Sequence, residues 1–206
     1  MSESPHRVSD VMTHTVVAVG REAPFKEVVE LLDQWKVSAV PVLAGEGRVV
    51  GVVSEADLLR KEEFRDSDEG DPVERAKAGA VTAGELMSAP AVTVHADATL
   101  GEAARIMARR HVKRLPVVDS VGLLQGVVSR SDLLKVFLRD DAEIAEEIRG
   151  SVLGRLPFTT PLTVSVTEGV VTLGGTLPDR TLLPMLARAV RSVEGVVDIR
   201  LDLAPR

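Results

Sequence analysis

The sequence predicts a mixed α/β (α+β) fold: two β-α-β-β-α units, followed by a small α-β-β-α-β domain. Two observations predict it. Residues 11–59 align without a gap with residues 86–134, at a constant offset of 75 positions. After Leu138 this similarity ends, and short stretches that alternate apolar with polar residues follow, which is typical of half-buried strands. The length of 206 residues is enough for more than one domain.

Each repeat has the same predicted elements in the same order. A short lead segment and a brief extended piece precede an amphipathic helix, which covers residues 25–35 in the first repeat and 100–110 in the second. A strand that contains Pro41 or Pro116 follows, and these prolines are expected to mark a sheet edge or a bulge. A glycine turn, a second strand and a closing helix complete the unit.

The C-terminal unit is predicted from its own segments. Residues 140–153 have the apolar spacing of a helix, and two alternating strands meet at Glu168-Gly169, a hairpin signal. A helix over about residues 180–193 and a strand at 196–203 complete it.

The charged stretch at residues 61–80 is predicted to be a helix tail and an exposed linker. With this linker, the segments define three domains, at residues 7–66, 82–139 and 141–206.

The main functional signal is the stretch GVVSEADLL, which recurs as GVVSRSDLL. In each copy a β-branched strand turns into a helix at a serine, Ser54 or Ser129. A helix N-terminus offers free N–H groups and a positive dipole end to a phosphate. Asp57 and Asp132, three residues later, can accept hydrogen bonds from two ribose hydroxyls, which predicts two nucleotide sites. The same Ser-x-x-Asp pattern is also a variant of the capping box, which only satisfies the helix itself.

The two sites are predicted to differ in charge. Cations favour phosphate by charge-assisted hydrogen bonds, so the site at Ser129 and Asp132 is expected to bind phosphorylated ligands more tightly. The alternative is that these charges are a solvated surface. The second repeat contains His111, Lys113, Arg114 and Arg130 where the first has Lys36, Ser38, Ala39 and Glu55.

Composition excludes several classes of function. Aromatic residues are 2% of the chain and the net charge is −6, which counts against nucleic-acid binding. The absence of cysteine excludes disulfides and thiolate catalysis, and the four histidines lack ligand spacing. No nucleophile–base pair or P-loop motif is present, so no catalysis is expected. No secretory segment or apolar run of bilayer length is visible, which predicts a cytoplasmic protein.

The repeated motifs together resemble a pair of cystathionine-β-synthase (CBS) domains, the tandem often called a Bateman module. They are the lead motifs DVM and ELM, the strands Val-x-x-Val-Pro-Val and Val-x-x-Leu-Pro-Val-Val, and GVVSxxDLL, in order over about residues 7–139. The resemblance implies two units packed sheet to sheet. It also implies a regulatory ligand in the clefts between them, namely AMP, ADP, ATP or S-adenosylmethionine, and no cofactor.

The same resemblance assigns roles to residues. It implies ribose contacts from Asp57 and Asp132 and phosphate contacts near Ser54 and Ser129. Apolar residues would then flank the adenine: Val16, Val40, Pro41, Val92, Leu115 and Pro116.

The C-terminal segment resembles a BON domain over about residues 141–203. The pattern Gly169-x-Val171-x-Leu173-x-Gly175 and the run Val193-Glu194-Gly195-Val196-x-x-Ile199 carry this resemblance. BON domains are associated with phospholipid binding in envelope proteins. A phospholipid or a protein partner is therefore expected for this domain.

These features predict a regulatory protein that senses adenosine ligands, as in energy sensing, with the BON domain as an interaction module. CBS pairs form homodimers through their helices, and a homodimer is expected here. The alternatives are a structural adaptor whose serine–aspartate pairs are only caps, a membrane-surface protein that acts through the BON domain, and an undetected enzyme. No nucleic-acid partner is expected.

Overall fold

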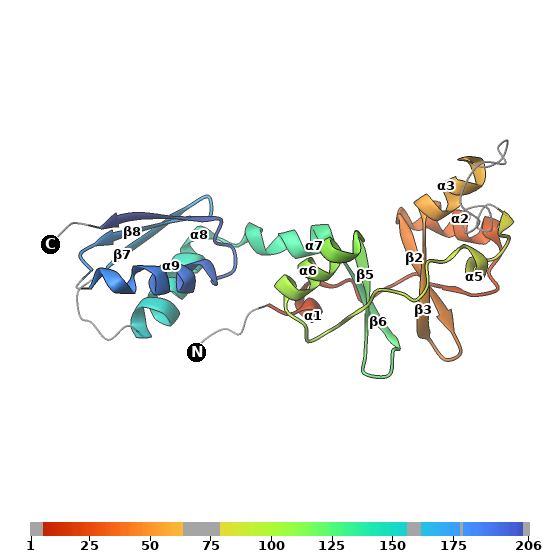
Figure 1. Cartoon of the computed structure of the whole chain (residues 1–206), viewed down its shortest axis with the longest axis horizontal. Coiled ribbons are helices and arrows are strands. Elements are labelled where there is room, and N and C mark those ends of the chain that lie inside the picture. Colours follow the sequence, from red (N-terminus) through yellow and green to blue (C-terminus); the bar gives the residue numbers. More distant parts are fainter. Residues whose placement is uncertain (1–5, 64–78, 156–161, 178, 204–206) are drawn as a thin grey trace. The chain divides into compact units, whose positions relative to one another are not determined.

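The computed structural model describes residues 6–63, 79–155, 162–177 and 179–203 (Figure 1). They form two compact units, one of residues 7–130 and one of His6 with the chain from Ser131 onward. The predicted α/β class is confirmed by helices and three small sheets. Residues 64–78 of the predicted linker lie outside the described residues, as do the ends of the predicted domains at 64–66 and 204–206.

The first repeat forms a three-stranded sheet with the order β1-β2-β3. Strand β1 runs parallel to β2, and β3 runs antiparallel to it. Because β2 is the middle strand, Pro41 does not mark a sheet edge; the register of β2 and β3 shifts just after it, between Val42 and Leu43, as the predicted bulge requires. The elements are β1 (Val19–Gly20), α2 (Phe25–Trp35), β2 (Ala39–Ala44), β3 (Arg48–Ser54) and α3 (Glu55–Glu63).

The second repeat has the same sheet, with the order β4-β5-β6. Its register shifts at the matching place, between Val117 and Val118. The helical spacing predicts an apolar side of α6 made of Leu100, Ala103, Ala104 and Met107; three of these are buried, whereas Ala104 is exposed. The elements are β4 (Val94–His95), α6 (Leu100–Arg110), β5 (Arg114–Val118), β6 (Leu124–Ser129) and α7 (Arg130–Leu134).

The lead segments, residues 7–13 and 82–88, are exchanged between the repeats. The first contains α1 (Val8–Val11), and the amides of Val8 and Ser9 donate to carbonyl oxygens of the second repeat, at Ala98 and Ala96. The second contains α5 (Ala83–Leu86), whose Ala83 and Leu86 are buried in the core of the first repeat. Each repeat therefore completes the fold of the other.

The exchange also pairs each lead segment with a motif strand. Thr13 forms two backbone hydrogen bonds with Val127 in β6, and Ser88 forms two with Val52 in β3. Next to these pairings, methionine side chains lie directly over glycine. A Cβ atom at Gly51 would lie 2.5 Å from Sδ of Met87, and one at Gly126 would lie 2.8 Å from Sδ of Met12 and from the carbonyl oxygen of Thr13. A side chain at either position would therefore have to displace the methionine or the paired backbone.

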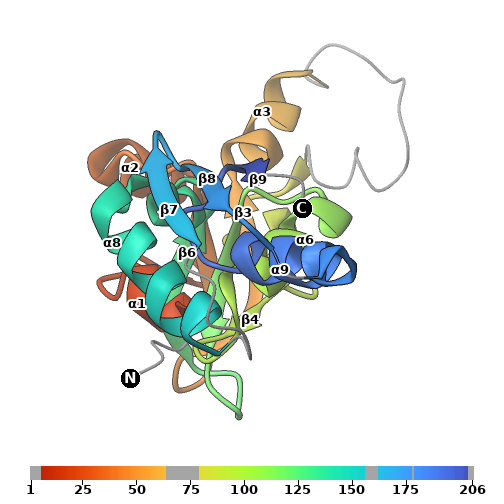
Figure 2. The ribbon, with the colours of Figure 1, turned by 90° about the vertical axis from the view of Figure 1, so that its left-hand side faces the viewer.

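The C-terminal unit has a sheet with the order β7-β8-β9, with β8 antiparallel to β7 and parallel to β9. Helices α8 and α9 pack on the face of this sheet that carries Val164, Val171 and Leu173 (Figures 1 and 2). The predicted elements are confirmed as α8 (Asp141–Glu147) with a π-helical turn (Ile148–Val152), β7 (Thr163–Thr167), β8 (Val170–Gly175), α9 (Leu183–Arg191) and β9 (Asp198–Leu203).

The hairpin between β7 and β8 is held by a carboxylate from α8. Glu168 and Gly169 both have positive φ, 52° and 71°, as a two-residue hairpin turn of this kind requires. The oxygens of Asp141 accept hydrogen bonds from the amides of Glu168 and Gly169, at 2.8 and 2.9 Å. Asp141 thus fixes the turn relative to the helix.

Adding a methyl group at Gly51 or Gly126 is expected to destabilise the unit of residues 7–130. Gly51→Ala and Gly126→Ala should each cost about 1–3 kcal/mol of unfolding free energy, because overpacking displaces the methionine or the paired backbone. Gly101→Ala is the matched control, since a Cβ there meets nothing within 4 Å. Urea denaturation of the full chain measures all three, and equal effects would contradict the close approach.

Removing the Asp141 carboxylate is expected to destabilise the C-terminal unit. Asp141→Ala should cost about 1.5–3 kcal/mol, since two amides lose a charged acceptor. Glu143→Ala removes the same charge from the same first helical turn and should cost less, because Glu143 is exposed. Thermal denaturation measures the melting temperature of the two variants. Equal melting temperatures would contradict the role of Asp141 in holding the hairpin turn.

Candidate functional site

A cleft of about 460 Å³ lies within the unit of residues 7–130, and both repeats line it. The first repeat contributes the end of β3 and the start of α3, including Ser54, Glu55 and Asp57. The second contributes two segments. One runs from Ser88 to Val92 and the other from His111 to Arg114. The exchange of lead segments brings the first of these to the motif, because Ser88 pairs with Val52.

Asp57 is held in place at the wall of this cleft. Its Oδ2 accepts hydrogen bonds from the amide of Ser54 at 3.0 Å and from Oγ of Ser54 at 2.6 Å. Its Oδ1 accepts a longer bond, 3.3 Å, from Oγ of Ser88. Asp57 is 7% exposed, and among the described residues it is the only buried polar one. The carboxylate therefore has a fixed orientation.

These contacts bear on both interpretations of the Ser-x-x-Asp motif. The bond from the Ser54 amide is the backbone half of a helix cap, so the capping role is present. The bond from Ser88 comes from the other repeat, 31 residues away, and a cap does not require it. A ligand hydroxyl that replaced the Ser88 hydroxyl at Oδ1 would leave the cap intact.

The basic residues of the second repeat lie at the same cleft. Helix α6 ends at His111, whose φ of 54° is left-handed, and the chain then runs through Lys113 into β5. The guanidinium of Arg114 reaches across to the first repeat. Its Nη2 donates to Oγ of Ser38 at 2.6 Å, and its Nη1 donates to the carbonyl oxygen of Ala39 at 3.2 Å.

This placement changes the grouping that the sequence suggested. The sequence grouped His111, Lys113 and Arg114 with Ser129 and Asp132, but in the structure these three residues line the cleft of Ser54 and Asp57. For Arg114 the physical reason is the reach of its side chain. The backbone of Arg114 pairs with Ser129, whereas its guanidinium extends to the other repeat.

At the second motif, Arg130 is turned toward the backbone beside it. Its amide donates to the carbonyl oxygen of Lys113 at 3.0 Å, and its Nη2 donates to that of Val112 at 3.2 Å. Asp132, in α7, accepts a hydrogen bond from Nζ of Lys135 at 2.8 Å. Ser129 ends β6, in the position that Ser54 has in β3.

Only some of the residues predicted to flank adenine lie at the cleft. Val92 lines the cleft, whereas Val40, Pro41, Leu115 and Pro116 are buried within the two central strands. Val16 is half-buried and precedes β1. The apolar lining of the cleft instead includes residues that the sequence did not single out: Ala39, Val52, Pro90, Ala91 and Val112. Ser88 was also missed, because its position depends on pairing with a distant strand.

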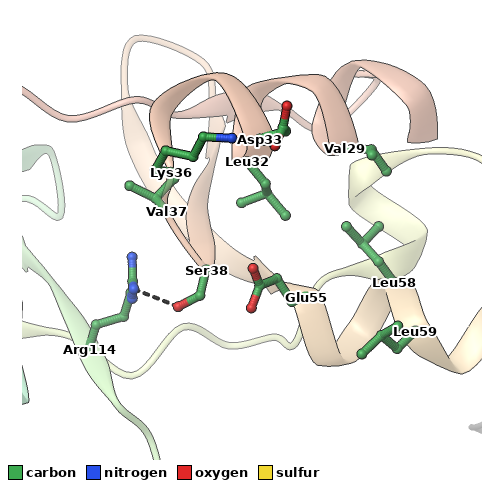
Figure 3. A pocket seen from close by; sticks show the side chains of 10 residues that line it. All are labelled: Val29, Leu32, Asp33, Lys36, Val37, Ser38, Glu55, Leu58, Leu59 and Arg114. Carbon is green, nitrogen blue, oxygen red and sulfur yellow. Dashed lines mark hydrogen bonds and ion pairs between the residues drawn. The ribbon is translucent and has the colours of Figure 1, made fainter.

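A second hollow, of about 670 Å³, lies between α2 and α3 (Figure 3). Val29, Leu32 and Leu58 give it an apolar lining, and Ser38, Glu55 and Arg114 border it as well as the cleft. We call it the α2–α3 groove. Figure 3 shows Arg114 at its edge, bonded to Ser38.

Within the described ranges, no group of three or more histidine, aspartate or glutamate side chains is placed to hold a metal ion. Among the helices with described positions, none is both long enough and apolar enough to span a bilayer.

Family models match most of the chain. The CBS domain model matches residues 8–63 and 83–139, and the BON domain model matches residues 140–204. The chain belongs to the CBS domain family. It has two CBS domains followed by a BON domain, as the motifs predicted. The cleft therefore lies within a CBS pair.

Known proteins match the CBS pair in different settings. An uncharacterised protein of Methanocaldococcus jannaschii is 27% identical over 153 residues, covering 64% of this chain and 90% of that protein. The inosine-5'-monophosphate dehydrogenase of Korarchaeum cryptofilum is 28% identical over 145 residues, covering 70% of this chain but only 26% of the enzyme. The crystal structure of CBSX2 in complex with AMP has a TM-score of 0.59 and 28% identity, covering 65% of this chain and 97% of CBSX2, a protein of Arabidopsis thaliana.

Loss of the two hydrogen bonds from the Arg114 guanidinium to Ser38 and Ala39 is expected to weaken the packing of the two CBS domains. Arg114→Ala should cost about 1–3 kcal/mol of unfolding free energy, because it removes two hydrogen bonds with a charged donor. Arg114→Lys should recover only part of this, since an ammonium group cannot present the planar fork. Arg109→Ala, at an exposed position near the end of α6, is the control. Urea denaturation tests the order of stabilities, and an Arg114→Ala variant as stable as the control would contradict it.

Proposed function

We propose that this CBS pair is a regulatory module that binds an adenosine nucleotide in the cleft at Asp57, and that it has no catalytic activity. The fixed carboxylate of Asp57, in a cleft lined by both repeats, is the observation that carries the proposal. A solved relative of the same family, CBSX2, is a complex with AMP, which supports this class of ligand.

Each part of a nucleotide has matching chemistry in the cleft. A ribose presents two neighbouring hydroxyls, and Asp57 is an oriented acceptor for them. The adenine ring would lie against apolar lining such as Val52, Pro90 and Val92. The phosphate would lie near the start of α3 and the cations of the second repeat. The equivalent roles of Ser129 and Asp132 in a second site are part of the same proposal.

Sensing would follow from the shared cleft. Because the cleft is built from both repeats, a ligand that contacts both favours one arrangement of the pair over others. The BON domain or a dimer interface would transmit that change. A dimer would use the helices of the CBS pair, where Val29, Trp35 and Leu59 are exposed apolar residues of α2 and α3. A protein or phospholipid partner for the BON domain, the cytoplasmic location and a role in energy sensing stay predictions.

A structural adaptor is the second candidate, because the Ser54–Asp57 bonds are those of a helix cap. The two candidates differ in their response to nucleotide. A ligand that binds the folded chain raises the melting temperature, and above the Kd the rise grows with the logarithm of ligand concentration, whereas a cap alone gives no shift.

Substitution of Asp57 is expected to weaken AMP binding. Asp57→Asn keeps the shape of the side chain but removes its charge, and should reduce affinity by about 1–3 kcal/mol, the range for hydrogen bonds to charged groups. Asp198→Asn, exposed in β9, is the control. Calorimetric titration of the full chain with AMP measures both variants.

The outcome separates the two candidate functions. Loss of affinity in Asp57→Asn with unchanged binding in Asp198→Asn supports the nucleotide site. If AMP does not bind the wild-type chain, and Asp57→Asn only lowers the melting temperature, the structural adaptor is favoured.

A further inference from the structure

We propose that β9, the edge strand of the C-terminal sheet, pairs antiparallel with β9 of a second copy of the chain. Two three-stranded sheets would then join into one, related by a two-fold axis at Leu201. This interface is independent of the nucleotide site and is additional to any contact through the helices of the CBS pair.

Strand β9, labelled in Figure 2, has one side without a neighbouring strand. It is the last strand in the order β7-β8-β9, and its register with β8 is continuous from Asp198 to Leu203. Among the described residues, no hydrogen bond outside the ladder with β8 involves β9. The unpaired N–H and C=O groups of an edge strand are a template for pairing with another strand.

The other edge of the same sheet already has a side-chain partner. In β7, the carbonyl oxygen of Val164 accepts a hydrogen bond from Nη2 of Arg149 at 2.8 Å. Helix α8 also lies against this strand. The two edges therefore differ, and β9 is the one available for pairing.

The apolar side of β9 is incompletely covered. Leu201 is the ladder partner of Leu173, so both lie on the face of the sheet that packs against α8 and α9. Leu173 is fully buried, whereas Leu201 is 47% exposed. The helices thus cover the centre of the sheet but not this edge. A second β9 beside the first would bury Leu201 against the same residue of the other copy.

The charges on the other side of β9 complement those of a second copy. Arg200 and Asp202 are exposed and form no ion pair within the described part of the chain. A two-fold axis at Leu201 places Arg200 opposite Asp202 of the second copy, and the symmetry repeats this pair. On the apolar side, Ile199 then lies opposite Leu203. Opposite charges and apolar pairs placed directly across two strands stabilise the pairing.

Other registers are less favourable. With the axis at Arg200, this residue would face itself and Asp198 would face Asp202, so that like charges meet. An axis at Ile199 would again bring opposite charges together, but it would leave the second half of β9 unpaired. Strand β9 is therefore self-complementary over most of its length in one register.

The test exchanges charges within β9 of the full chain. Sedimentation equilibrium over a range of concentrations compares wild type, Arg200→Asp, Asp202→Arg and the double variant with both changes. Each single variant should weaken self-association at least about tenfold, because two attractive pairs become repulsive. The double variant should recover the wild-type association. An equimolar mixture of the two single variants should also associate, since their charges are complementary between the two chains.

Asp198→Arg is the matched control. It reverses a charge on the same side of β9, but Asp198 lies outside the region that is paired when the axis is at Leu201. Its self-association should therefore not fall. A dimer that forms only through the CBS helices would respond to none of these variants.

A single cysteine gives a direct readout, because the chain has no cysteine of its own. Leu201→Cys should form a disulfide between two chains on mild oxidation, since directly opposite Cβ atoms lie about 5 Å apart. Ser165→Cys, at an exposed position in the middle of β7, is the control and should not. Adding Arg200→Asp to Leu201→Cys should suppress the disulfide.

The possible results divide clearly. Association that the single charge variants weaken and the double variant restores, together with the Leu201→Cys disulfide, supports the proposal. It is wrong if the single variants associate like wild type, if Asp198→Arg weakens association as much as Asp202→Arg, or if Ser165→Cys forms the disulfide equally well. A chain that does not self-associate, but whose binding to phospholipid vesicles changes with these variants, would assign this edge to a membrane and also overturn the proposal.

Discussion

The structure of the CBS pair depends on the close approach of each lead segment to the motif strand of the opposite repeat. Thr13, at the end of the first lead segment, pairs with Val127 in β6, and Ser88, at the end of the second, pairs with Val52 in β3. The approach is only possible because Gly51 and Gly126 have no side chain, so that Met87 and Met12 can occupy the space above them. The two glycines thus permit this approach, and Ala83 and Leu86 of the second lead segment are buried in the core of the first repeat.

The cleft at Asp57 follows from the same exchange. Because Ser88 pairs with Val52, its hydroxyl reaches Oδ1 of Asp57, and the chain that follows it forms one wall of the cleft. Arg114 crosses in the same direction and binds Ser38 and Ala39. A ligand in such a cleft contacts both repeats at once, so that binding energy acts on their packing without a separate relay.

The sequence was informative where the signal is local. The helices at 25–35 and 100–110 and the hairpin at Glu168-Gly169 are set by residues close in the chain, and the structure confirms them. The position of Ser88 and the direction of the Arg114 side chain were not predictable, because both depend on pairing between residues far apart in sequence. The adenine-flanking strands show the same limit: periodicity marks Val40 and Leu115 as strand residues, but not that they face the core.

Capping and ligand binding need not be alternatives for Asp57. The cap bonds from Ser54 hold the carboxylate in one orientation before any ligand arrives, and a preorganised acceptor loses little conformational entropy on binding. The Ser88 bond is the longest of the three and comes from the other repeat, so it is the contact that a ribose hydroxyl would most easily replace. Such a replacement would leave α3 capped while changing one link between the repeats. The motif would then serve stability in the empty state and sensing in the bound state with the same two side chains.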